Sequence, residues 1–305
     1  PPAQIADTRA VEELNDAEAL SQKLLKCDTS AAEEGCGISV RYLAFARRLM
    51  PADKVFTSLM TAFMLADKDP RYAGINFVGP EDRELPLKEY RLHMEMIKFL
   101  SEKFPKVHRT MHTGEMTLGI VPTTWMRDDI RLSIEVGGAE RIGHAASMAF
   151  QRDARELLAR MARDRIAVEI NQSTNKLLPV KGSAHPIRMF LAAGVPIVIS
   201  TDDQGLARTD TAVEFLTAVV EHGLTYPQLK QAVRNSLEYS FLGGQSLWSD
   251  GQYDKPAAGC PIATASTSVP PSCEQLLAGS EKARMQVDLE GAFARFERDV
   301  VTTPF

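Results

Sequence analysis

Side chains that suit hydrolytic chemistry occur at intervals through the middle of the sequence: His112, Glu115, His144, Asp202 and Asp203. Imidazole nitrogens and carboxylate oxygens are donors that zinc accepts, and the same groups transfer protons near neutral pH. A His with a Glu three residues later, a second His and a pair of Asp residues together indicate a metal site with an acid–base set.

Each of these signals also has a plain structural explanation when it is taken alone. A His followed by a Glu at the third position usually lies on an exposed helix face, and a single His144 would more often be a core histidine. The pair Asp202-Asp203 could cap the helix that we expect over residues 209–221. The joint order of the motifs, with a strand pattern before the first of them, favours the functional interpretation.

Six short apolar segments rich in β-branched residues read as buried strands, over residues 39–45, 74–78, 107–112, 141–144, 166–170 and 196–200. They recur about every 30 residues with helical periodicity between them, which is the spacing of repeated βα units. No hairpin signal interrupts this alternation, so we expect a parallel sheet that is closed or covered by helices. The candidate residues follow the third, fourth and sixth strands, at the carboxyl ends where βα barrels carry their active sites.

At these motifs the chain resembles the adenosine deaminase family, and within it the larger adenosine-deaminase-related growth-factor type. HTGE at 112–115 is similar to the family's HAGE, RIGHA at 141–145 to RIGHG, and STDDQG at 200–205 to STDDP. The resemblance runs from about Ile38 to Trp248 and includes VGPED at 78–82. It implies a TIM-type (β/α)8 barrel, of which this chain holds about six βα units, strands 3 to 8.

The resemblance implies a role for each matching position. His112 would be a zinc ligand through an imidazole nitrogen, and Asp202 would be the carboxylate ligand of the same zinc ion. His144 would orient the attacking water and accept its proton. Glu115 would hold a proton and deliver it to ring N1 of a purine, so that C6 becomes electrophilic.

The purine itself would be recognised by two further groups. The resemblance implies a hydrogen bond from Asp203 to N7 and one from the backbone N–H of Gly79 to N3, although Gly79-Pro80 reads equally well as a turn. Together these contacts would specify a 6-aminopurine. The implied reaction is the hydrolysis of adenosine or deoxyadenosine to inosine, or its deoxy form, and ammonia.

The chain also departs from the family pattern. The family begins with an HxHxxG segment that supplies two further histidine ligands, and no HxH occurs here. By alignment, the first two strands are absent. Three explanations stay open: an N-terminal part outside this numbering, which we favour, strands supplied by another chain, or a degenerate homologue. Thr113, Ala145 and Gln204 replace the family's Ala, Gly and Pro, and none of the three changes removes a reacting group.

These departures keep two other functions in view. One is a non-catalytic purine-binding or signalling homologue with a degenerate metal site. The other is a metal-dependent deaminase of a different aminopurine. The incomplete metal set motivates the first, and the absence of the family's ribose-contacting segment motivates the second.

Composition excludes several classes of protein. The 305 residues are 44% hydrophobic and 25% charged, values that fit a folded globular chain and neither a disordered nor a fibrous one. Lys and Arg number 35 against 40 Asp and Glu, without a basic stripe, so we expect no nucleic acid as partner. The near balance of charge also fits the small purine nucleoside that the resemblance implies. No apolar run has the roughly 18 to 20 residues that cross a membrane. A homodimer stays open.

We expect an N-terminal helical segment over 1–37, a partial barrel over 38–248, and an irregular connection with a helix over 249–305. Four cysteines form two close pairs, Cys27 with Cys36 and Cys260 with Cys273, which read as local disulfides or as unpaired thiols. Disulfides would favour a periplasmic or secreted location over the cytoplasm. The first residues lack the pattern of a signal peptide, so either none existed or it was removed before this numbering begins.

Overall fold

A computed structural model describes residues 2–175, 180, 184–257, 260 and 271–302. Two compact units make up the chain: Pro1–Glu169 with Asn175–Val195, and Ile170–Thr174 with Pro196–Phe305. The two units are described separately below, each by its own contacts.

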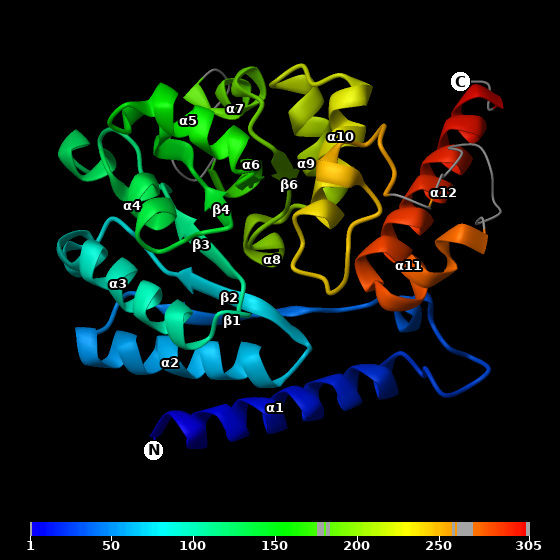
Figure 1. Ribbon diagram of the computed structural model, residues 1–305, viewed down its shortest axis with the longest axis horizontal. Helices are drawn as coiled ribbons and strands as arrows, with labels where there is room; N and C mark the ends of the chain where they lie inside the picture. Colours follow the sequence, from blue (N-terminus) through cyan, green and yellow to red (C-terminus); the bar gives the residue numbers. More distant parts are fainter. Residues whose placement is uncertain (1, 176–179, 181–183, 258–259, 261–270, 303–305) are drawn as a thin grey trace. The chain divides into compact units, whose positions relative to one another are not determined.

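The first unit alternates strands with helices (Figure 1). Its elements are α1 (Pro2–Leu24), η1 (Glu34–Gly37), β1 (Tyr42–Arg47), α2 (Ala52–Lys68), β2 (Tyr72–Val78), α3 (Glu84–Lys103), β3 (Arg109–Thr113), η2 (Thr123–Met126), α4 (Asp129–Glu135), β4 (Arg141–His144), η3 (Ala146–Phe150), α5 (Ala154–Arg163), β5 (Ala167–Ile170) and α7 (Ile187–Ala193). The short helix α6 (Gln172–Asn175) spans the change from one unit to the other along the chain. Strands β1 to β5 pair in parallel, each with the next.

The second unit begins with β6 (Ile197–Ile199), and Ser200, just after it, donates to the carbonyl of Ile170 at 3.1 Å. Its other elements are α8 (Gln204–Ala207), α9 (Thr211–Val220), α10 (Tyr226–Glu238), η5 (Ser249–Gly251), η6 (Pro271–Cys273), α11 (Glu274–Gly279) and α12 (Glu281–Thr302). The order of strands in the sheet is their order in the chain, β1 to β6. All six predicted strands are confirmed, with ends that move by up to three residues.

Helix α2 shows why the first unit folds as it does. Its buried residues Val55, Leu59, Ala62 and Phe63 recur at intervals of three and four, so they form one stripe, which faces β1 and β2. Burial of each large side chain in such a stripe contributes about 1.5 to 3 kcal/mol. On the outer side, α1 runs along α2 (Figure 1).

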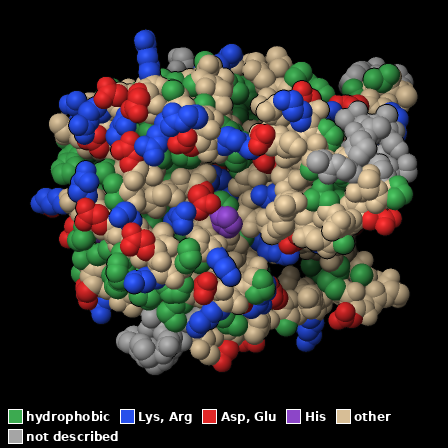
Figure 2. Space-filling view, viewed as in Figure 1, with side chains coloured by type: hydrophobic (Ala, Val, Ile, Leu, Met, Phe, Trp, Pro, Cys, Tyr) green, Lys and Arg blue, Asp and Glu red, His purple; other side chains and the backbone are tan. Residues whose placement is uncertain are grey.

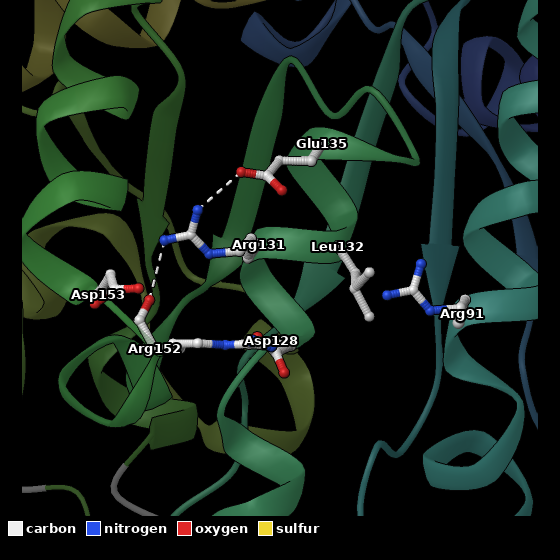
Figure 3. A pocket seen from close by; sticks show the side chains of 7 residues that line it. All are labelled: Arg91, Asp128, Arg131, Leu132, Glu135, Arg152 and Asp153. Atoms are coloured by element: carbon white, nitrogen blue, oxygen red, sulfur yellow. Dashed lines mark hydrogen bonds and ion pairs between the residues drawn. The ribbon is translucent and has the colours of Figure 1, made fainter.

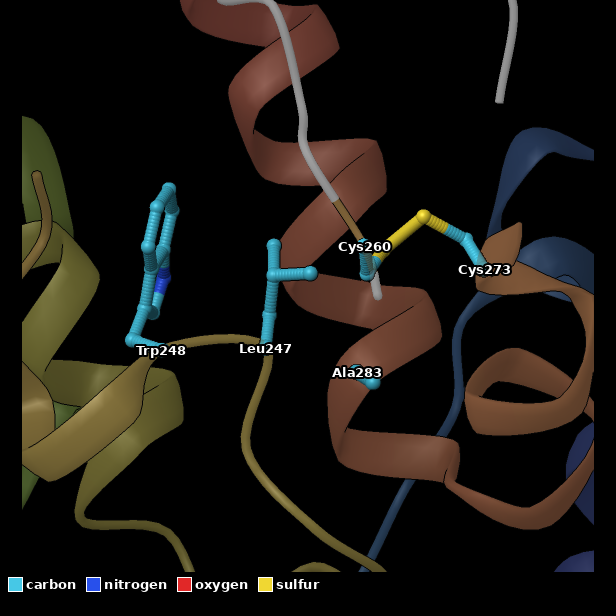
Figure 4. Packing of buried hydrophobic residues seen from close by; sticks show 5 residues of the cluster. All are labelled: Leu247, Trp248, Cys260, Cys273 and Ala283. Atoms are coloured by element: carbon cyan, nitrogen blue, oxygen red, sulfur yellow. A yellow bond between two sulfur atoms is a disulfide. The ribbon is translucent and has the colours of Figure 1, made fainter. Parts of the chain in front are cut away.

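The second unit has its own small core around a disulfide. Leu247, Trp248, Cys260, Cys273 and Ala283 form a buried cluster (Figure 4), with the bond between Cys260 and Cys273 inside it. In the first unit, Cys27 is bonded to Cys36. The sequence left local disulfides and unpaired thiols open for the two pairs, and the structure has the disulfides. Part of the predicted irregular connection, residues 258–259 and 261–270, lies outside the described residues.

The surface in Figure 2 carries Lys and Arg side chains interspersed with Asp and Glu. This mixture on the face viewed agrees with the near balance of positive and negative residues in the sequence. Among the described residues, no helix is both long enough and apolar enough to cross a bilayer.

Candidate active site

Two neighbouring strands carry the candidate residues of the first unit. In the parallel register of β3 and β4, His112 pairs with Gly143 and Thr113 pairs with His144. His112 is therefore on β3 near its carboxyl end, His144 is the last residue of β4, and Glu115 follows β3 by two residues. Because both strands run in the same direction, all three side chains leave the sheet at one edge.

The three side chains meet. Glu115 Oε2 lies 3.2 Å from His112 Nε2, and Glu115 Oε1 lies 3.6 Å from His144 Nδ1. The two imidazole rings face each other edge to face, with centroids 4.4 Å apart. One donor atom from each residue falls within 4.8 Å of the others, so this group can hold a metal ion.

The donor set fits zinc. His112 Nε2 is buried and has no hydrogen-bond partner among the described residues, although a buried polar atom normally has one. Such an atom is the one that a metal ion would take up. Nitrogen and oxygen donors of this kind suit zinc.

The pKa of Glu115 is lower than usual. Burial raises it, but the close contact with His112 Nε2, at 3.2 Å, and the charges of His144, His112 and Arg48 lower it by more. Glu115 is therefore ionised at neutral pH in this arrangement. It is ready to accept a proton, and before it can deliver one to a ring nitrogen it must first take one up.

The backbone at the strand ends adopts the left-handed conformation. The φ angles are +70° at His144, +49° at Ala145 and +52° at Asp202. Non-glycine residues with such φ angles cost about 1 to 2 kcal/mol each. Strain of this kind gathers at functional sites, where the surrounding structure holds it in place. The positive φ at Ala145 also explains why the family has a glycine at that position.

Asp202 and Asp203 belong to the second unit, whereas the other candidate residues belong to the first. The side chain of Asp203 makes no capping hydrogen bond to α8, although Asp203 is at its N-cap position. Helix α9 is capped instead by Asp210, whose carboxylate accepts the N–H of Val213 at 2.8 Å. A side-chain cap of α8 therefore does not account for Asp203, and neither acid is the N-cap of α9.

Gly79 follows β2 and has a φ of +113°, which favours glycine strongly. The turn that the sequence suggested at Gly79 is therefore confirmed. The contact between the backbone N–H of Gly79 and purine N3 stays a prediction. Next to the turn, sequence reasoning missed two charged residues that are fully buried, Arg48 and Glu81. Arg48 directly follows β1 and Glu81 lies three residues after β2, within VGPED, and a charge close to a strand end was the available signal.

A second missed contact involves His144. Its Nδ1 lies 3.3 Å from Asn175 Oδ1, and Asn175 Nδ2 lies 3.1 Å from His185 Nε2. His185 also accepts the N–H of Ile187 at 3.2 Å through Nδ1. The structural role predicted for His185 therefore includes support of Asn175, which contacts a candidate catalytic residue.

A pocket of about 280 Å³ lies elsewhere in the first unit and is lined by Arg91, Asp128, Arg131, Leu132, Glu135, Arg152 and Asp153 (Figure 3). Its charges largely satisfy one another: Arg131 binds Glu135 at 2.8 Å, and Arg152 binds Asp128. None of its lining residues belongs to the group formed by His112, Glu115 and His144, which stays the candidate site.

Comparison with known proteins shows which family the chain matches. The sequence model of adenosine deaminases matches residues 10–246. An adenosine deaminase of Escherichia coli is 31% identical over 140 residues, which are 45% of this chain and 39% of that protein. The chain therefore spans well under half the length of this curated relative.

Two solved structures share the fold. An amidohydrolase from Burkholderia ambifaria with bound zinc superposes with a TM-score of 0.56 at 20% identity, over 68% of this chain and 53% of that one. An Arabidopsis protein in complex with IMP superposes with a TM-score of 0.51 at 22% identity, over 67% and 54%. With the parallel strands and alternating helices, this confirms the prediction of a partial TIM-type barrel.

Proposed function

The chain belongs to the adenosine deaminase family, and we propose that it carries part of a metal-dependent site for the hydrolytic deamination of a 6-aminopurine, with adenosine or deoxyadenosine as substrate. One observation carries the proposal: His112, Glu115 and His144 converge, and the buried Nε2 of His112 is left without a hydrogen bond among the described residues. The curated adenosine deaminase of E. coli supports a nucleoside substrate.

His112 and Asp202 would hold one zinc ion, together with two histidines from a part of the barrel outside this sequence. Zinc lowers the pKa of the water that it binds, so hydroxide becomes available near neutral pH. The chain's own residues then orient the reactants and move the protons. Asp203 would bind purine N7, and the N–H of Gly79 would bind N3.

In this proposal the proton passes from the water to His144, then to Glu115, and finally to ring N1. His144 orients the attacking water and accepts its proton. Since His144 Nδ1 lies 3.6 Å from Glu115 Oε1, a small movement lets the proton pass on to Glu115. Glu115 then delivers it to ring N1 as the attack on C6 proceeds.

Replacement of Glu115 tests this proposal. In the full-length, zinc-loaded protein, we expect Glu115→Gln to lower kcat for adenosine by about 10²- to 10⁴-fold, the usual contribution of a positioned acid or base. Ammonia release measures the rate. Glu140→Gln is the matched control, because Glu140 also bonds a histidine, His108 at 2.7 Å, outside the site. Retention of most activity in Glu115→Gln would reject the proton route.

Two other functions stay testable in the same assay. A non-catalytic purine-binding homologue is favoured by the metal group, which brings together only three donor side chains among the described residues. Calorimetric binding of adenosine without ammonia release would establish it. A deaminase of another aminopurine is suggested by the Arabidopsis protein bound to IMP. Faster turnover of AMP than of adenosine would establish that function.

The two disulfides also support a periplasmic or secreted location rather than a cytoplasmic one, because reducing compartments keep such thiols unpaired. Fractionation of the native cells, with alkylation of free thiols before lysis, measures both the location and the state of the cysteines.

A further inference from the structure

Two buried charges beside the candidate site have no role in the proton route. The side chain of Arg48, directly after β1, is fully buried, and that of Glu81, three residues after β2, is 2% exposed. Burial of ionised groups is costly unless each is paired and hydrogen-bonded. The contacts that compensate these two charges therefore show what the pair does.

The two side chains do not compensate each other fully. The closest ionic contact, between Arg48 Nη1 and Glu81 Oε2, is 3.6 Å. Among the described residues, Nε and Nη1 of Arg48 have no hydrogen-bond partner. A guanidinium and a carboxylate that pair only with each other usually form two short parallel hydrogen bonds. This pair forms none and directs its hydrogen bonds elsewhere.

Both side chains bind the backbone of the turn that carries the candidate residues. Arg48 Nη2 donates to the carbonyl of His112, and also to the carbonyl of Phe77 at 3.0 Å. The carboxylate of Glu81 accepts the N–H of Gly114 at 3.0 Å through Oε2 and the N–H of Glu115 at 2.9 Å through Oε1. The turn over residues 112–115 is thus held at both of its ends.

This turn needs such support because its backbone is constrained. Gly114 has a φ of +78°, and a Cβ atom at that position would lie 2.9 Å from Cδ1 of Ile130 and 3.0 Å from Cα of Ala145. The turn therefore has little room to relax. A small rotation about it would also separate Glu115 Oε2 from His112 Nε2, which now lie 3.2 Å apart.

We propose that Arg48 and Glu81 are positioning residues that clamp the turn over residues 112–115 and so set the place of the Glu115 carboxylate relative to His112. The proposal rests on the proposed deaminase function for its effect on rate. The clamp itself is a set of three hydrogen bonds to the backbone of the turn, with a fourth from Arg48 to the carbonyl of Phe77, and it can be observed without turnover. Neither residue needs to touch the purine.

The chemistry of each side chain suits this task. A carboxylate offers acceptors on both oxygens, so Glu81 can bind two adjacent N–H groups at once, whereas an amide would turn an NH₂ towards one of them. The planar guanidinium of Arg48 places its donors in a fixed geometry, whereas the ammonium group of a lysine keeps the charge on a flexible stem. Glu81→Gln and Arg48→Lys therefore remove the clamp and change the volume little.

The experiment compares Glu81→Gln and Arg48→Lys with the wild type in the full-length, zinc-loaded protein. Arg234→Lys is the control, because Arg234 forms a largely buried pair with Glu290 within the second unit, whereas Arg48 and Glu81 belong to the first. We measure kcat and KM for adenosine, and hydrogen exchange at the amides of Gly114 and Glu115. A displacement of about 1 Å in a reacting group costs on the order of 10²-fold in rate.

For both clamp variants we expect kcat to fall by about 10- to 100-fold, with KM within about 3-fold of the wild type. The amides of Gly114 and Glu115 should exchange at least about 10-fold faster in Glu81→Gln, while exchange in the strand interiors is unchanged. Arg234→Lys should change neither measurement. Since Arg48→Lys keeps the positive charge, it also tests the clamp if Glu81→Gln does not fold.

Three results would overturn the clamp. The first is unchanged exchange at both amides in Glu81→Gln. The second is a fall in kcat for Glu81→Gln with no fall for Arg48→Lys, which would make Glu81 a group that acts on the substrate itself. The third is wild-type kcat in both variants. A wild type without deaminase activity would reject the proposed function instead, and the exchange measurement would still decide whether the clamp exists.

Discussion

Each unit contains an arginine–glutamate pair that is largely buried beside aromatic rings. In the second unit, Arg234 donates through Nε and Nη2 to the two carboxylate oxygens of Glu290, at 2.6 Å each, and its guanidinium lies 5.8 Å from the centroid of Trp248. In the first unit, Arg48 lies 4.8 Å from the centroid of Phe77, but its ion pair with Glu81 is 3.6 Å long.

The difference shows two uses of the same residue types. The pair in the second unit satisfies itself and links α10 to α12, so its contribution is one of packing. The pair in the first unit is open and gives its hydrogen bonds to the turn that carries Glu115. Because Arg48 and Glu81 are not in close contact, their charges neutralise each other less completely. Each charge therefore also shifts the pKa of neighbouring titratable groups.

The largest expected effect comes from replacing both partners with apolar residues in each unit. Arg48→Met with Glu81→Leu leaves the N–H groups of Gly114 and Glu115 without acceptors, and we expect a loss of about 3 kcal/mol or more in the free energy of unfolding. Arg234→Met with Glu290→Leu leaves no backbone group unpaired, so it should be neutral or stabilising.

Urea unfolding measures both double variants. Trp125 in the first unit and Trp248 in the second report on each unit through fluorescence. As a control, Glu290→Ala alone should cost about 3 to 5 kcal/mol, since it leaves a buried arginine uncompensated. Equal losses for the two double variants would remove the distinction between an open and a closed pair.

A smaller effect is expected at Asp129, which is buried near Glu81. Burial and the charge of Glu81 raise the pKa of Asp129 to about 7. The carboxyl of an unfolded chain ionises near pH 4, so the folded state binds more protons between about pH 4 and 7. The free energy of unfolding therefore falls as the pH rises through this range.

Asp129→Asn should abolish this component, which is of order 3 kcal/mol. We expect the variant to be more stable than the wild type at pH 7.5 and nearly equal to it at pH 4, as measured by urea unfolding across this range. Glu81→Gln should shift the wild-type transition to lower pH, because it removes a neighbouring negative charge. Parallel pH profiles for Asp129→Asn and the wild type would contradict the assignment.

The smallest effect is expected at His93 on α3. Burial, and next the charge of Arg48, lower the pKa of His93 to about 4, and neither ring nitrogen has a hydrogen bond among the described residues. Below pH 6.5 the unfolded chain binds the extra proton, so this residue reduces stability as the pH falls from about 6.5 to 4.

His93→Leu should therefore stabilise the first unit by about 1 kcal/mol at pH 7, because it removes two unpaired buried nitrogens. The gain should grow as the pH falls towards 5. Thermal unfolding at pH 5 and pH 7 measures both values. His108→Leu is the control, since His108 is exposed and bonded to Glu140. A loss of stability at both pH values would show that the imidazole ring packs better than leucine.

The strands and the core of the site could be predicted because they depend on local patterns. Apolar segments rich in β-branched residues marked all six strands, and parallel strands must bring their carboxyl ends to one edge. His112, Glu115 and His144 therefore met as expected. The order of motifs carried more information than any one residue, since each residue alone had an ordinary structural explanation.

The remaining features depend on contacts between distant segments. Glu81 stands in VGPED close to a strand end, but the sequence does not show which groups it binds, because a carboxylate binds whichever N–H groups the fold brings to it. The same is true of Arg48, whose partner His112 is 64 residues away. The sequence likewise did not decide which acid caps α9. In the structure it is Asp210, and not Asp202 or Asp203, that accepts the N–H of Val213.

Residue type and strand spacing were thus enough to predict that His112, Glu115 and His144 meet, since hydropathy and side-chain chemistry belong to each residue. Folding was needed to identify the groups that hold them in place. Hydrogen bonds from a side chain to a distant backbone leave no periodic mark in a sequence, and the burial that gives Arg48 and Glu81 their importance exists only once the strands have assembled.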